Sequence, residues 1–299
     1  MLEVRNLTKT FGDYYAVDHL SFKIEPGSIM GLIGQNGAGK TTTFRLILDF
    51  LTANQGEILW NGKKIGKNDY DIIGYLPEER GLYPKVSIQD QLIYFAQLRR
   101  KTKKEIEPKI DEWLSRFQVK GKKTDKVKTL SKGNQQKVQL IATLIHEPQL
   151  IILDEPFSGL DPVNAELLKE GILSLKKQGS CVIFSSHNME HVEKICDHLV
   201  MLNNGKSVLN GVVHEIRESF GRTKVFLESP ITRDEIALLD GVTDVRERED
   251  QTLEITLSNP EVGKEIFRLA TADGYIPMFN QQPPTLEEIF KQKVGEANV

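Results

Sequence analysis

One segment, Gly34-Gln35-Asn36-Gly37-Ala38-Gly39-Lys40-Thr41, constrains the fold of this chain more than any other. It fits G-x-x-x-x-G-K-[ST], the pattern of a phosphate-binding loop. The apolar run at 29–33 predicts a buried strand before it, and apolar residues at helical spacing over 41–51 predict a helix after it. Backbone N–H groups of such a glycine-rich turn and helix start point at phosphate oxygens. The segment therefore predicts a nucleotide site, in which Lys40 reaches the β- and γ-phosphates and Thr41 completes a Mg²⁺ site.

A second landmark, Leu150-Ile151-Ile152-Leu153-Asp154-Glu155, is an apolar run that ends in two adjacent carboxylates. Adjacent carboxylates repel each other unless a cation or a substrate uses them. Because Pro156 disfavours a helical conformation in the residue before it, we expect Glu155 to keep an extended backbone at the strand end. Strands that alternate with helices around both segments predict an α/β core with a largely parallel sheet.

Changes in pattern along the chain predict its domains. We expect a main domain at 1–220, with a helical subdomain at about 86–146 that begins at a capping residue, Ser87. The predicted helices of this subdomain lie near 88–100, 103–117 and 133–146. Residues 221–299 contain no glycine-rich loop and no candidate nucleophile. Their pattern predicts a small α+β accessory domain, and the sequence does not indicate its function. Its predicted strands are 223–228, 242–248 and 253–257, and its predicted helices are 261–271 and 285–294.

Composition excludes several functional classes. The 299 residues are 39% hydrophobic and 27% charged, with a net charge of −3, so no overall positive field recruits nucleic acid. A lysine-rich stretch at 120–128 is expected to be a solvated face rather than a binding patch. The two cysteines, Cys181 and Cys196, lack metal-ligand spacing and predict buried thiols of a reducing compartment. Since no run approaches 18 apolar residues and no signal peptide is evident, we expect a cytosolic chain.

Over about residues 1–215, the order of motifs resembles the nucleotide-binding subunit of ABC transporters. The corresponding segments are the P-loop, Gly74–Glu78 as the Q-loop, Leu130–Asn134 as the signature loop, Leu150–Glu155 as the Walker B strand, Ser158–Asp161 as the D-loop, and His187 as the switch histidine. The segment YLPEERGLYP and the C-terminal tail resemble those of the NatA-like bacterial exporter branch. The resemblance implies a P-loop NTPase core of the ABC type and ATP hydrolysis coupled to transmembrane transport.

The resemblance also assigns roles to single residues. Asp154 would hold Mg²⁺ through water, Glu155 would be the general base, and His187 would contact the γ-phosphate. The expected catalytic residues are Lys40, Glu155 and His187. The expected ATP-binding residues are Phe11, which would stack on adenine, and Gln35, Asn36, Gly37, Ala38, Gly39, Lys40, Thr41 and Thr42. The expected metal-site residues are Thr41, Asp154 and Glu78. The other histidines are interpreted as structural.

In the family geometry, the signature loop completes the nucleotide site of a second copy. The residues expected to act in trans are Ser131, Lys132, Gly133 and Asn134, and Asp161 is assigned to the D-loop. The resemblance therefore implies a homodimer that binds ATP and Mg²⁺, a separate membrane permease, no nucleic acid partner, and a peripheral position on the cytoplasmic face of the cell membrane. Three positions depart from the usual pattern: Glu78 stands where glutamine is expected, Lys132 replaces a glycine, and Asn134 replaces a glutamine.

Two alternatives remain open from the sequence. The chain could be a soluble ABC mechano-ATPase that acts on ribosomes, DNA or protein assemblies, although a single P-loop and the absence of a long heptad tract favour transport. It could also be a binding module that no longer hydrolyses ATP, as Glu78 and Lys132 suggest. The argument against that third hypothesis is the retention of Lys40, Asp154, Glu155 and His187.

Overall fold

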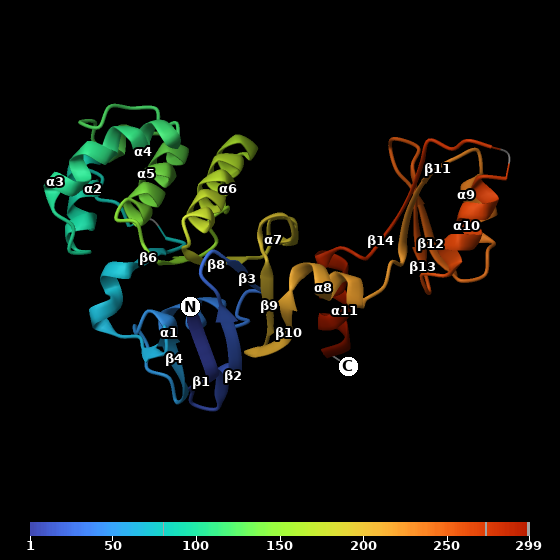
Figure 1. Ribbon diagram of the computed structural model, residues 1–299, viewed down its shortest axis with the longest axis horizontal. Coiled ribbons are helices and arrows are strands. Elements are labelled where there is room, and N and C mark those ends of the chain that lie inside the picture. Colours follow the sequence, from blue (N-terminus) through green and yellow to red (C-terminus); the bar gives the residue numbers. More distant parts are fainter. Residues whose placement is uncertain (80, 273, 298–299) are drawn as a thin grey trace. The chain divides into compact units, whose positions relative to one another are not determined.

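The computed structural model describes residues 1–79, 81–272 and 274–297, and the chain divides into two compact units, Met1–Gly211 and Val212–Val299 (Figure 1). The sequence places a domain boundary after residue 220, whereas this division falls after Gly211. Helix α8 (Val213–Ser219) therefore groups with the C-terminal unit. None of the helices in the described part of the chain has the length and hydrophobicity needed to cross a membrane.

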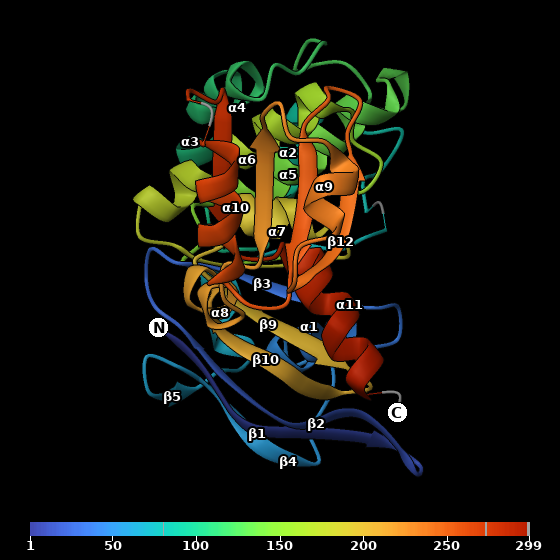
Figure 2. The ribbon, with the colours of Figure 1, turned by 90° about the vertical axis from the view of Figure 1, so that its right-hand side faces the viewer.

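The N-terminal unit contains two sheets (Figure 2). The smaller one has the order β2-β1-β4-β5 and pairs its strands antiparallel: β1 (Leu2–Phe11), β2 (Tyr14–Ile24), β4 (Gln55–Trp60) and β5 (Lys63–Lys64). The larger one has the order β10 (Lys206–Val212), β9 (His198–Asn203), β3 (Ile29–Gly34), β8 (Cys181–Ser186), β7 (Leu150–Leu153) and β6 (Ile73–Leu76). In this larger sheet β3, β7 and β8 are buried along their whole length, and their pairings are parallel. The prediction of an α/β core with a largely parallel sheet is confirmed.

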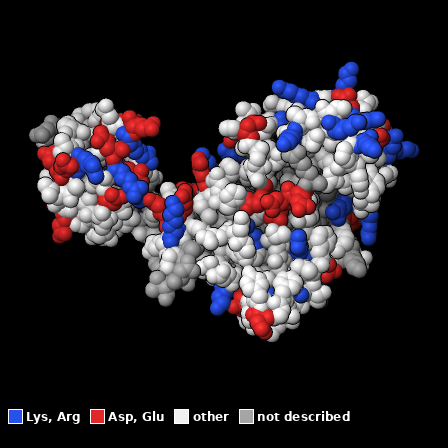
Figure 3. Space-filling view, turned by 180° about the vertical axis from the view of Figure 1, so that it is seen from behind, with Lys and Arg blue, Asp and Glu red and all other residues white. Residues whose placement is uncertain are grey.

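Helices make up most of the segment from Ile88 to Leu144. They are α2 (Ile88–Gln97), α3 (Lys103–Ile106), α4 (Ile110–Arg116) and α5 (Lys132–Leu144), with short 3-10 helices at Glu107–Lys109 and Val127–Thr129. A further 3-10 helix, Lys67–Ile72, precedes β6. Ser87 caps α2 as predicted, because its hydroxyl accepts the Asp90 N–H at 3.1 Å. The helix predicted over 103–117 is interrupted where Pro108 lacks the N–H that a helix interior needs. The lysines at 120, 122, 126 and 128 are exposed, and Figure 3 shows basic side chains over this helical part at the upper right.

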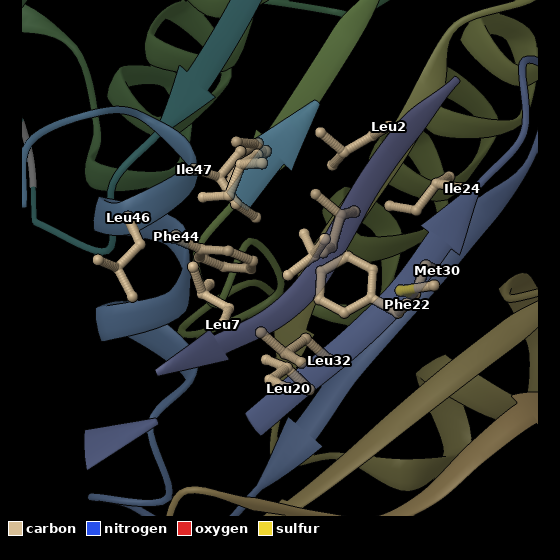
Figure 4. Packing of buried hydrophobic residues seen from close by; sticks show 14 of the residues in the cluster. Leu2, Leu7, Leu20, Phe22, Ile24, Met30, Leu32, Phe44, Leu46 and Ile47 are labelled. Atoms are coloured by element: carbon tan, nitrogen blue, oxygen red, sulfur yellow. The ribbon is translucent and has the colours of Figure 1, made fainter. Parts of the chain in front are cut away.

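One hydrophobic core joins the two sheets to the helix that follows the phosphate-binding segment, α1 (Lys40–Ile47). In Figure 4, Phe44 of α1 lies beside Leu7 of β1, and Ile47 of the same helix belongs to the same cluster. The helix ends earlier than the predicted residue 51. Asp49 adopts a left-handed φ of 56°, and the Phe50 N–H returns to the Arg45 carbonyl at 2.8 Å, which closes the helix. This packing fixes the start of α1 at the carboxyl end of β3.

The other helices of the N-terminal unit are α6 (Pro162–Lys177) and α7 (Met189–Ile195). The C-terminal unit has an antiparallel sheet of order β12 (Val242–Glu247), β13 (Leu253–Leu257), β11 (Lys224–Glu228) and β14 (Met278–Gln282). Its helices include α9 (Arg233–Ala237), α10 (Val262–Ala270) and α11 (Leu286–Ala297). Its core packs Ile266 of α10 against the strands. The three predicted strands and two predicted helices are present, but α8, α9 and β14 were missed because they are short and lack a clear apolar period.

Candidate functional site

A cavity of about 570 Å³ opens above the start of α1 and the carboxyl ends of β3 and β7. It is lined by Phe11, Tyr14, Ala16, Gln35, Asn36, Gly37, Gly39, Lys40, Thr41, Thr42, Glu78, Asp154, Glu155, Ser158 and His187. These residues include every member of the expected catalytic and metal sets. Of the expected ATP-binding residues, only Ala38 does not line the cavity, because its side chain is buried behind the loop.

The phosphate-binding turn needs glycine at two positions for conformational and steric reasons. Gly37 and Gly39 have φ angles of 82° and 108°, which side-chain-bearing residues rarely adopt. A Cβ atom at residue 39 would also lie 2.3 Å from the Ala16 carbonyl oxygen. The turn therefore brings backbone to the cavity without side chains in the way, and α1 begins directly behind it with its free N–H groups.

Lys40 is the buried cation of the cavity, with 7% of its side chain exposed. Its Nζ donates to the carbonyl oxygens of Gly34 at 2.8 Å and Gln35 at 3.2 Å. The same atom lies 4.0 Å from Glu155 Oε1. The ammonium group is thus anchored on the turn itself and held beside the carboxylate, where it can meet an anionic ligand.

Asp154 is held through both of its carboxylate oxygens. The Ser185 hydroxyl donates to Oδ1 at 2.7 Å, and the Thr41 hydroxyl donates to Oδ2 at 3.1 Å. Asp154 is only 3% exposed, and its N–H donates to the Leu76 carbonyl at 2.8 Å. The start of α1 and the ends of β6, β7 and β8 therefore meet at this one residue.

Glu155 does not keep the extended backbone that the following proline predicts. Its φ is 49°, in the left-handed region, and its N–H donates to Ser185 Oγ at 2.8 Å. This hydrogen bond holds a conformation that the residue before a proline would otherwise avoid. The side chain is 11% exposed, and its Oε2 lies 2.9 Å from Nδ1 of His187, whose ring is largely exposed. The structure thus places carboxylate, imidazole and ammonium groups together on one side of the cavity.

The Thr41–Asp154 pair fits a magnesium ion. Mg²⁺ prefers oxygen ligands, keeps several waters, and is commonly held by one or two carboxylates together with substrate phosphates. Thr41 Oγ1 and Asp154 Oδ2 supply such oxygens at the phosphate end of the cavity, and the exposed Glu78 lies at its rim. No group of three or more His, Cys, Asp or Glu side chains suited to a metal occurs in the described residues.

Two aromatic side chains line the end of the cavity near the β1–β2 turn. Phe11 is 51% exposed, so it is not the core residue that its position in a strand would otherwise suggest. Tyr14 is 54% exposed, and its hydroxyl donates to the Gly37 carbonyl at 3.1 Å. Tyr14 was not among the predicted site residues, although a second aromatic residue three positions after Phe11, at a tight turn, was a usable signal.

The signature residues are not brought to this cavity. Ser131 caps α5 and accepts from Asn134 Nδ2 at 2.9 Å, and Lys132 is exposed at the first turn with Gly133 beside it. Asp161 caps α6, and the hydrogen bond from the Asn164 N–H lowers the pKa of this exposed carboxyl below its usual value. None of these five residues lines the cavity that holds Lys40.

The comparisons with known families agree with this geometry. The family profile described as ABC transporter matches residues 17–158, and the profile of the ATP-binding protein DrrA1-3-like C-terminal domain matches residues 211–294. The uncharacterized ABC transporter ATP-binding protein YhaQ of Bacillus subtilis is 46% identical over 99% of this chain and 99% of its own length. NatA of the same organism, an ABC transporter ATP-binding protein, is 36% identical over 68% of this chain and 85% of its own length. The Nod factor export ATP-binding protein I of Rhizobium etli is 30% identical over 98% of this chain and 93% of its own length.

A solved structure of the ATP-binding subunit of an ABC transporter superimposes with a TM-score of 0.69 at 30% identity, covering 74% of this chain and 93% of that one. The predicted P-loop ATPase fold of the ABC type and the predicted likeness to NatA are thereby confirmed. An ATP-binding domain of this family implies that the chain binds nucleotide. The chain belongs to the ATP-binding proteins of ABC transporters, a family of ATPases coupled to transport.

Proposed function

We propose that two copies of this chain enclose ATP and Mg²⁺ between them and hydrolyse the nucleotide to drive export through a separate membrane permease. The observation that carries the proposal is the division of the site residues. Lys40, Thr41, Asp154, Glu155 and His187 line one cavity, whereas the signature residues lie elsewhere on the same unit. A site of this kind is complete only when a second copy supplies its signature loop.

Within one copy, each side chain has a role that its position supports. Lys40 and the turn N–H groups would bind the phosphates, and Phe11 would stack on the base. Glu155 would accept a proton from the attacking water, and its contact with His187 would orient its carboxylate toward the γ-phosphate. Thr41, Asp154 and Glu78 would hold Mg²⁺, whose charge neutralises the phosphate oxygens.

From the second copy, the start of α5 would face the γ-phosphate. Ser131 and Gly133 would donate hydrogen bonds, Asn134 would support Ser131, and the N-terminal end of the helix would favour the negative charge. Lys132 would add a cation on the same side. Asp161, at the start of α6, would lie along the interface between the copies. Loss of the γ-phosphate removes the attraction, so hydrolysis opens the pair.

The wider setting of the proposal is a cytoplasmic protein bound peripherally to the inner face of the cell membrane. Residues 1–220 would form the ATPase domain, and residues 221–299 would form an accessory domain. Export, rather than import, is supported by the Nod factor export relative. No nucleic acid partner is proposed, because the net charge of −3 offers no overall attraction to phosphate backbones.

ATP turnover per subunit is expected to rise with protein concentration and then level off, because only paired copies have complete sites. Steady-state phosphate release over a wide range of chain concentrations, at saturating ATP and Mg²⁺, measures this directly. Analytical ultracentrifugation with ATP should show the fraction of dimer rising over the same range. Constant turnover per subunit, down to concentrations at which only monomers sediment, would contradict catalysis in trans.

Affinity purification of the tagged chain from native membranes is expected to recover a protein with several membrane-spanning helices. If nucleotide binding and permease binding are coupled, the amount of this membrane protein retained by the tagged chain should increase when a nucleotide that is not hydrolysed is present. The untagged chain, carried through the same purification, serves as the control for nonspecific capture. Recovery of ribosomes or DNA-bound proteins in place of a membrane protein would favour the soluble mechano-ATPase.

A further inference from the structure

The strongest unassigned feature of the N-terminal unit is a fully buried hydroxyl group, that of Ser185, at the end of β8. Strands β7 and β8 are parallel neighbours, and Leu153 is paired with Phe184. The next residues of the two strands, Asp154 and Ser185, therefore emerge side by side toward the cavity. Ser185 does not line the cavity itself, so it acts on a ligand only through other residues.

The Ser185 hydroxyl makes two hydrogen bonds of opposite kinds. It donates to Asp154 Oδ1 at 2.7 Å and accepts from the Glu155 N–H at 2.8 Å. A hydroxyl group has one donor and two acceptor positions, so this single atom can serve both neighbours. Alanine supplies neither bond, and cysteine is a weak substitute for both.

Each hydrogen bond has a consequence at the cavity. Because Ser185 occupies Oδ1 of Asp154, the other oxygen, Oδ2, is the one presented to Thr41. Because Ser185 also holds the Glu155 N–H, the backbone at Glu155 stays at a φ of 49°, and the side chain is carried to Lys40 and His187. Conformations of this kind persist only where the surroundings fix them.

We infer that Ser185 is a positioning residue that fixes Asp154 and Glu155 together, and so couples the magnesium site to the residue that activates water. The inference rests on the proposed function, since it assigns a task to the carboxylates of that site. A purely structural role would predict lower stability only. The positioning role predicts a specific loss in the response to Mg²⁺ and in turnover, with ATP binding in the absence of metal retained.

The test compares Ser185→Ala with wild type in the full-length chain, with two readouts. The first is the affinity for a fluorescent ATP analogue in EDTA and again in Mg²⁺. The second is kcat for ATP hydrolysis. Residues that hydrogen-bond to metal ligands and orient them typically contribute 10- to 100-fold to metal affinity or to activity. We expect the gain in affinity on adding Mg²⁺ and kcat each to fall by roughly tenfold or more, with the affinity in EDTA unchanged.

Two further variants separate positioning from folding. Ser180→Ala is the matched control, because Ser180 is also a buried serine and its hydroxyl donates to the Pro148 carbonyl at 2.9 Å, away from the cavity. It is expected to leave both readouts unchanged. Ser185→Thr keeps a hydroxyl on a strand and is expected to restore most of both. If the alanine variant fails to fold, Ser185→Cys takes its place with losses expected in the same two readouts, because a thiol is a weak substitute for both hydrogen bonds.

The outcomes distinguish this inference from the function on which it rests. If the wild-type chain hydrolyses ATP, and Ser185→Ala has the same Mg²⁺ response and the same kcat, the positioning role is overturned. The proposed function then remains intact. Equal losses in Ser180→Ala and Ser185→Ala also overturn it. A wild-type chain that binds ATP with Mg²⁺ but never hydrolyses it, even with its permease, overturns the proposed function, and the Mg²⁺ dependence of ATP binding still tests Ser185.

Discussion

Replacement of Glu155 by glutamine is expected to lower kcat for ATP hydrolysis by roughly 10²- to 10⁴-fold, the usual contribution of a positioned general base. Glutamine has nearly the same shape, so Ser185 can still hold the backbone N–H of residue 155. Glutamine lacks the negative charge with which the carboxylate of Glu155 attracts a proton from water. Measurement of phosphate release at saturating ATP gives the loss in kcat.

The same substitution is expected to stabilise the nucleotide-bound dimer, because ATP stays intact between the two copies. Size-exclusion chromatography with ATP and Mg²⁺ should show a dimer for Glu155→Gln under conditions where wild type dissociates. Glu166→Gln is the matched control, since Glu166 is an exposed residue of α6 paired with Lys169 and lies outside the cavity. Hydrolysis at the wild-type rate in Glu155→Gln would remove Glu155 from the role of base.

The parts of the fold that follow from local pattern were predictable from the sequence. The apolar runs at 29–33 and 150–153 became the buried strands β3 and β7, because a parallel sheet covered on both faces needs uninterrupted apolar segments. The hairpin at β4 and β5 follows from Asn61 and Gly62, whose φ angles of 50° and 79° are those of a tight two-residue turn. In these places short-range chemistry decides the conformation.

Predictions failed where tertiary contacts outweigh local preference. Pro156 alone favours an extended Glu155, but a serine 30 residues later in the chain holds the left-handed conformation through one hydrogen bond. The role of Ser185 could not be predicted either. Nothing near Ser185 in the sequence shows that β8 lies beside β7. The residues of separate motifs that line the cavity could be grouped from the sequence only because the family resemblance supplied their arrangement.

Substitution of Lys40 by alanine is expected to weaken ATP binding by about 10²-fold. Hydrogen bonds to charged groups contribute roughly 1.5–3 kcal/mol, and 1.4 kcal/mol corresponds to a factor of ten in affinity. The Lys40 ammonium is buried, and the turn carbonyls of Gly34 and Gln35 hold it in place, so it is positioned before ATP arrives. An arginine is not expected to substitute for it, because a planar five-donor group does not fit a pocket built around one compact cation.

The thermal stability of the chain with and without ATP measures this loss. A ligand at 100 times its Kd stabilises the folded state by about 2.7 kcal/mol, and after a 100-fold loss in affinity the same concentration contributes about 0.4 kcal/mol. Nearly all of the ATP-induced shift in Tm should therefore disappear in Lys40→Ala, while Lys194→Ala, which alters an exposed lysine paired with Glu190, should keep it. A full shift in Lys40→Ala would mean that the turn N–H groups and the helix start bind the phosphates without the lysine.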